Sequence, residues 1–81
     1  ARARARREAR ARVDQLEAEV VALETRQKEL TEILERPETY DDPSAAMNAN
    51  RELMGIAEAL ERATAEWEQA AEALSALVDS E

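Results

Sequence analysis

Two long stretches of the chain repeat apolar residues at alternating steps of three and four. The first series is Val13, Leu16, Val20, Leu23, Gln27, Leu30 and Leu34. The second is Leu53, Ala57, Leu60, Thr64, Trp67, Ala71, Leu74 and Val78. This spacing keeps one column of an α-helix facing a partner helix, as in coiled coils. The pattern therefore predicts two long helices, each with one interacting face.

The two series are separated by a segment of turn-forming residues, Pro37–Pro43, which we call the tip. The first helix should end at Arg36, because a proline disfavours helical geometry in the residue before it. Asp42 is predicted to cap the second helix. Pro43 would then occupy its first position, where the missing N–H costs nothing.

Two further positions shape this picture. Tyr40 is the only large apolar side chain of the tip, and we expect it to fold back onto Met47 or Leu34 and close the turn. Gly55 falls outside the second column and should cost the second helix about 1 kcal/mol of helix propensity.

The pattern as a whole predicts an all-α fold, an antiparallel two-helix coiled-coil hairpin. We expect helices over about residues 9–36 and 43–79, joined by the tip at residues 37–43. The hairpin domain would span residues 13–81, preceded by a basic helical lead-in over residues 1–12.

Folding back at the tip would set the two columns antiparallel, pairing residues whose numbers add up to 87. Leu30 would then meet Ala57, and Val20 would leave room for the indole of Trp67. Such large-against-small pairing is what close packing between two helices requires.

Composition excludes several classes of function. The chain has no cysteine and no histidine, and no apolar run approaches the roughly 20 residues that span a bilayer. Its many glutamates would line a solvated rod rather than a water-excluding pocket, so we expect no catalytic residue, cofactor or metal. Asp41 and Asp42 lack the spacing and the glycine of a calcium loop and fit a turn and a helix cap instead. No enzymatic activity is predicted for the chain itself.

Charge is distributed very unevenly. Residues 1–12 carry six arginines against Glu8, a balance of +5, although the whole chain has a net charge of −8. These arginines are Arg2, Arg4, Arg6, Arg7, Arg10 and Arg12. Clustered guanidinium groups at one helix end can neutralise phosphates without reading base sequence. They form the candidate nucleic-acid-binding site; the alternative is a solvated linker that contacts acidic protein surface.

Several segments resemble a known family. They are Leu16–Glu24 in the first helix, the tip sequence Pro-Glu-Thr-Tyr-Asp-Asp-Pro, and Leu60–Glu66 leading into Trp67–Glu72. Over about residues 13–75 the chain resembles the C-terminal coiled-coil extension of ABC-F ATPases, twin-cassette ATP-binding proteins that act on ribosomes. The resemblance implies a cytoplasmic accessory arm that contacts DNA or ribosomal RNA through residues 1–12, attached to ATPase cassettes elsewhere in the parent chain.

Three alternatives remain open at this point. The tip also resembles the N-terminal helical domain of bacterial peptide-chain release factors. A structural coiled coil that joins a partner protein or self-associates would show the same periodicity, as would a spacer that holds the tip at a distance. Because the chain begins at Ala1 rather than methionine, we expect it to be a fragment of a longer protein.

Overall fold

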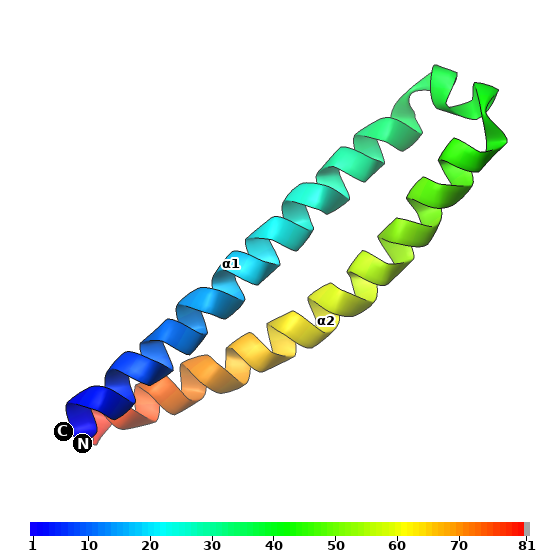
Figure 1. The fold of residues 1–81 in the computed structure, drawn as a ribbon. Helices are drawn as coiled ribbons and strands as arrows, with labels where there is room; N and C mark the ends of the chain where they lie inside the picture. The colour runs from blue at the N-terminus through cyan, green and yellow to red at the C-terminus, as the bar shows by residue number, and fades with distance from the viewer. Residues whose placement is uncertain (81) are drawn as a thin grey trace.

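The computed structural model describes residues 1–80, which form an antiparallel helical hairpin (Figure 1). Its elements are α1 (Arg2–Glu35), the short 3₁₀ helix η1 (Pro37–Asp41) and α2 (Pro43–Asp79). The hairpin measures 60 × 15 × 14 Å, and the described part contains no strand. The predicted all-α fold is confirmed, with both ends of the chain at the same end of the rod (Figure 1).

The column predicted for α1 faces α2. Val13, Leu16 and Leu30 are buried, with Leu16 completely covered and Leu30 only 2% exposed. The other members of the column are half-buried. The three-and-four spacing therefore identified the interacting face of α1 correctly.

The column predicted for α2 is wrong at three of its eight positions. Five members are half-buried as expected, namely Leu53, Leu60, Trp67, Ala71 and Leu74, whereas Ala57, Thr64 and Val78 are exposed. Their places are taken by residues one position earlier in each turn, of which Ile56 and Ala63 are buried and Leu77 is half-buried. The pairing of Leu30 with Ala57 is accordingly also wrong, because Leu30 lies in a buried cluster with Ala49 and Ile56.

The column was misassigned because small or apolar residues lie on both sides of the leucines of α2. Either side could therefore supply the alternate positions of the interacting face. Rotating α2 toward Ile56 buries a large aliphatic side chain where the alternative would bury only the methyl group of Ala57. The same rotation brings Glu52 and Glu66 to the flank that faces the arginines of α1.

The tip closes the end of α1 through hydrogen bonds. Arg36 leaves helical geometry, with φ −81° and ψ 125°, so α1 ends one residue earlier than predicted. The Thr39 hydroxyl donates to the carbonyl of Ile33, and the Tyr40 hydroxyl donates to the carbonyl of Leu34 at 2.7 Å. The bond from Tyr40 provides a partner for one of the carbonyls near the helix end, and the bond from Thr39 adds to the one that the Ile33 carbonyl accepts from the backbone N–H of Arg36, at 3.2 Å. The predicted contact of Tyr40 with Leu34 is confirmed.

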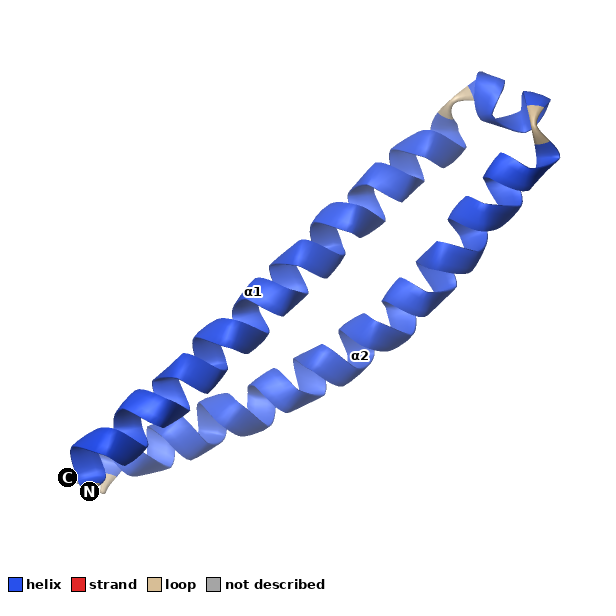
Figure 2. Ribbon diagram, viewed as in Figure 1, coloured by secondary structure: helices blue, strands red, loops and turns tan. Residues whose placement is uncertain are grey.

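The start of α2 is capped as the sequence predicts. The Asp42 carboxylate accepts hydrogen bonds from the backbone N–H and the hydroxyl of Ser44, at 3.0 and 2.8 Å, and Pro43 occupies the first helical turn. These bonds lower the pKa of Asp42 below its ordinary value, because they favour the ionised carboxylate. Figure 2 shows only short non-helical connections on either side of η1, so the tip is compact rather than a long loop.

Candidate nucleic-acid interface

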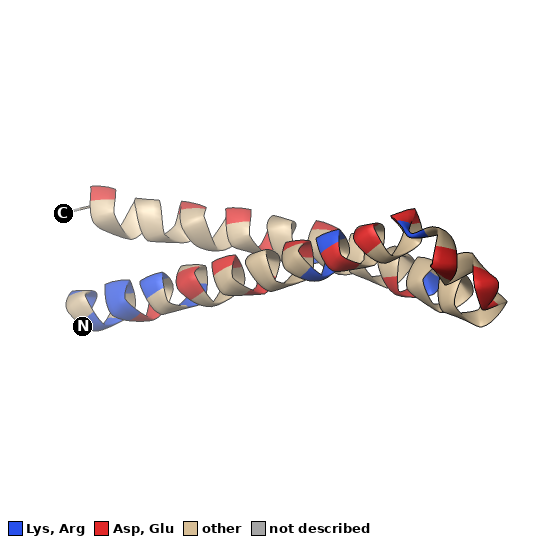
Figure 3. Cartoon of the chain, turned by 90° about the horizontal axis from the view of Figure 1, so that it is seen from above, with Lys and Arg blue, Asp and Glu red and all other residues tan. Residues whose placement is uncertain are grey.

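The basic end of α1 lies beside the C-terminal end of α2 (Figure 3). We call this end the root and define it as residues 1–12 of α1 together with residues 70–79 of α2. Neither α1 nor α2 contains an apolar stretch long enough to cross a membrane. Within residues 1–80 no cluster of acidic side chains has the arrangement of a metal site.

Three of the predicted arginines surround a surface hollow at the root. Arg6, Arg7 and Arg10 line it together with Ala3, and Leu74 and Val78 of α2 supply its apolar floor. Its volume is about 280 Å³. The structure thus brings guanidinium groups from successive turns of α1 to one face, beside apolar side chains of the other helix.

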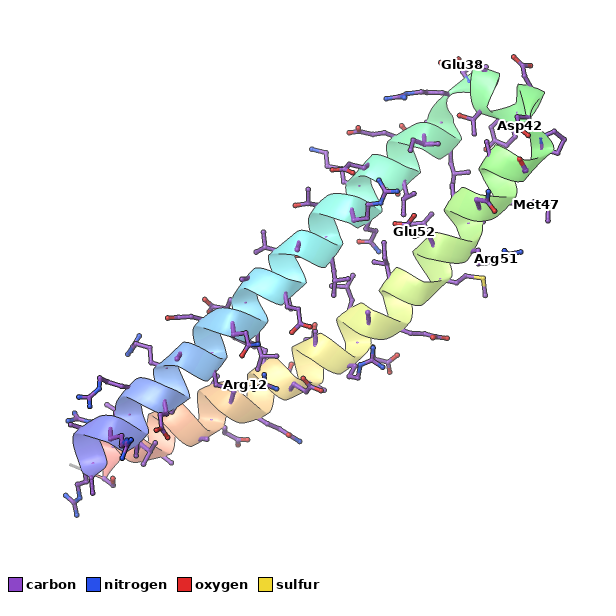
Figure 4. The ribbon with its side chains drawn as sticks, in the orientation of Figure 1. Arg12, Glu38, Asp42, Met47, Arg51 and Glu52 are labelled. Carbon is purple, nitrogen blue, oxygen red and sulfur yellow. The ribbon has the colours of Figure 1, made fainter. Side chains whose placement is uncertain are left out.

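Arg4 and Arg12 form ion pairs within the protein. Arg4 pairs with Glu8 one turn later, at 3.5 Å, and both side chains are largely exposed. Arg12 reaches across to Glu66 of α2 at 3.3 Å and points between the helices (Figure 4). Arg12 therefore contributes to holding the helices together, while Arg4 forms a solvated pair of the kind that contributes little to stability.

The charge of the root opposes helix stability. The amino terminus of a helix carries partial positive charge, so cations in its first turns are unfavourable and anions are favourable. α1 nevertheless begins at Arg2 with no acidic residue in its first turn and no side-chain cap. The first turns of α1 therefore concentrate positive charge that no acidic side chain of the first turn offsets.

A second ion-paired site lies in the half of the rod nearer the tip. Arg26 of α1 donates to both carboxylate oxygens of Glu52 of α2, at 2.6 and 3.0 Å, and also to Glu29. These bonds raise the pKa of Arg26 and lower that of Glu52. In Figure 4 Glu52 lies on the side of α2 that faces α1, whereas Met47 and Arg51 lie on its outer side.

Sequence reasoning missed the Arg26–Glu52 pair. The available signal was positional, because Arg26 immediately precedes the column residue Gln27 and so flanks the interacting face. A basic residue on such a flank commonly pairs with an acidic residue of the facing helix.

The middle of the hairpin holds the predicted pair of Val20 and Trp67. Both line a surface hollow of about 380 Å³, with Glu17, Val21 and Thr64. The indole N–H of Trp67 donates to the Glu17 carboxylate at 3.3 Å, across the two helices. Trp67 is half-buried and lines the hollow beside Val20.

Comparison with known proteins and families identifies the family of this chain. No curated protein and no solved structure matches the chain. The family model described as the ABC transporter C-terminal domain matches residues 4–72, which include most of the root arginines, the tip and Trp67. The resemblance to a C-terminal extension of an ABC protein is thereby confirmed, and the release-factor alternative is not supported. The chain belongs to the ABC transporter C-terminal domain family.

Proposed function

We propose that this hairpin is a non-catalytic, nucleic-acid-binding arm of a cytoplasmic ABC-F-type ATPase, and that it contacts DNA or ribosomal RNA through its root. The observation that carries the proposal is the grouping of Arg6, Arg7 and Arg10 around one hollow at the amino terminus of α1. Phosphate oxygens fit this surface because guanidinium groups bind them through paired hydrogen bonds.

The rest of the rod supports this assignment by contrast. Residues 13–81 carry eighteen acidic and five basic side chains, a balance of −13, and would repel a polyanion. Binding would therefore be confined to the root and would orient the hairpin with its tip away from the phosphates. Base sequence would not be read strongly, because the root has no aromatic side chain to stack on bases.

Binding of labelled duplex DNA and of structured RNA, each measured at two salt concentrations, tests the proposal. The test variant combines Arg7→Gln with Arg10→Gln, and its matched control combines Arg51→Gln with Arg62→Gln, two exposed arginines far from the root. We expect the root variant to weaken binding about tenfold and to reduce the salt slope by about 1 to 2, since fewer counterions are released.

The control should change the affinity less than about twofold. Equal losses in both variants would show attraction to net charge rather than to the root. Absence of binding to wild type at low salt would exclude the proposed function and leave the protein-interaction alternative.

A further inference from the structure

The two flanks of the hairpin differ in how they are closed. On one flank, ion pairs from Arg12 to Glu66 and from Arg26 to Glu52 bridge the helices. A residue advances about 100° around a helix, so Thr64 lies on the opposite flank of α2 from Glu66. That second flank carries the hollow at mid-length, where the Trp67 indole N–H donates to the Glu17 carboxylate across the helices.

The hollow is an apolar surface open to solvent. Val20, Val21 and Trp67 supply its apolar walls, and Val21 is 61% exposed. Its volume of about 380 Å³ falls within the range of sites that accept a ligand or a bulky side chain. An apolar hollow between two long helices that lie side by side suits an amphipathic helix laid along the groove between them.

Glu17 lines this hollow, and three other exposed carboxylates lie one helical turn from its lining residues. Positions three and four residues apart are neighbours on a helix, so Glu17 and Glu24 flank Val21 on α1. On α2 the corresponding neighbours of Thr64 are Glu61 and Glu68. Within residues 1–80 none of the four pairs with an arginine or lysine.

The negative charge around the hollow determines which class of molecule can bind there. A nucleic acid would be repelled, and a second copy related by a two-fold axis would bring the same carboxylates face to face. A helix that carries lysine or arginine beside its apolar residues would neutralise the rim as it covers the hollow.

We propose that the mid-length hollow docks a basic amphipathic helix of another polypeptide. One bulky apolar side chain of that helix would pack against Val21 and Trp67, and its cations would pair with the glutamates of the rim. This site is separate from the root, so it stands or falls independently of nucleic-acid binding.

Fluorescence anisotropy tests the docking site with a defined probe. The probe is a labelled amidated helix of about 18 residues, built from leucine, alanine and lysine with the leucines on one face. A control peptide carries glutamate in place of every lysine. The protein is the 81-residue chain as wild type, as Val21→Lys, and as Met54→Lys.

The two lysine variants form a matched pair. Both positions are exposed, at 61% for Val21 and 71% for Met54, and both substitutions add one positive charge. Only Val21→Lys obstructs the hollow. We expect it to weaken binding of the basic helix about tenfold or more, while Met54→Lys changes it less than about twofold.

Thr64→Lys, on the facing wall of the hollow, should weaken binding of the basic helix as Val21→Lys does. Circular dichroism of each variant checks that the loss of binding is not caused by unfolding. Equal effects of Val21→Lys and Met54→Lys would overturn the proposal, as would equal binding of the glutamate peptide. A wild-type dimer in sedimentation that Val21→Lys dissociates would also overturn it, by making a second copy the occupant.

Discussion

The tip and the root hold the same two helices together by different means. At the tip the chain is continuous, Thr39 and Tyr40 close the last turn of α1, and Leu30 lies in a buried cluster with Ala49 and Ile56. At the root no residue is fully buried, and the half-buried residues are alanines of both helices, Arg6, and two leucines of α2. The buried side chains of the helices thus lie between the root and the tip, from Val13 to Leu30 and from Ala49 to Ala63, whereas the root, which carries the candidate function, has only half-buried contacts.

This separation has a physical basis. Guanidinium groups are costly to remove from water, so a root that presents them to a phosphate backbone cannot also bury them in a core. The tip carries no such requirement and can be closed by local hydrogen bonds.

The largest expected effect comes from truncating one leucine at each end. Leu30→Ala near the tip should cost about 2–5 kcal/mol of unfolding free energy, because it leaves a cavity in a buried cluster. Leu74→Ala at the root should cost less than about 2 kcal/mol, since its side chain is only half-buried. Urea unfolding followed by circular dichroism measures both, and equal losses would contradict the contrast between the ends.

A smaller effect is expected from the hydroxyl groups of the tip. Thr39→Val keeps the shape but removes one part-buried hydrogen bond, and should cost about 1 kcal/mol because the Ile33 carbonyl keeps its second bond, from the backbone N–H of Arg36. Tyr40→Phe is the matched control, whose exposed hydroxyl should contribute only about 0.5 kcal/mol. If Tyr40→Phe proved the costlier change in thermal unfolding, the closure of the tip would depend on the exposed bond instead.

One substitution in α2 is expected to stabilise the hairpin. Gly55 has negative φ, and a Cβ built there meets no atom within 4 Å. Gly55→Ala should therefore raise the free energy of unfolding by about 0.5–1 kcal/mol through helix propensity. A lower melting temperature for this variant would mean that α2 needs its glycine for flexibility near the tip.

The smallest expected effect is a pH dependence at the Arg26–Glu52 pair. The pKa of Glu52 is lowered on folding, so its stabilisation is present above its ordinary value of 4.5 and is lost as pH falls through the folded value. Glu52→Gln should thus be less stable than wild type at neutral pH, and the difference should disappear once the pH lies below the folded pKa of Glu52. Glu58→Gln, at an exposed position of the same helix, should show no comparable convergence.

Periodicity alone predicted much of the fold. The interacting face of α1, the break at the prolines and the Asp42 cap follow from local rules, and the structure agrees with them. The rotation of α2 was not predictable in the same way, because the columns through Ala57 and through Ile56 both satisfy steps of three and four. Choosing the more apolar side chain of each neighbouring pair would have selected Ile56 over Ala57 and Ala63 over Thr64, and the facing charges of Glu52 and Arg26 would have supported that choice.

The candidate site was predictable as a composition but not as an arrangement. The arginine run identified the root, yet only the facing helix decides that Arg12 pairs with Glu66 while Arg6, Arg7 and Arg10 share a hollow. The role of Thr39 at the tip was invisible because it depends on a short 3₁₀ turn bringing its hydroxyl back to a carbonyl six residues earlier.

The position of Trp67 gives the molecule an internal optical reporter. It is the only tryptophan of the chain, and its indole bridges to α1 at mid-length. Its emission should shift to longer wavelength when the helices part there, because water then reaches the ring, while fraying confined to either end should leave the spectrum unchanged. Unlabelled protein can therefore show whether the two halves of the rod separate together or one after the other.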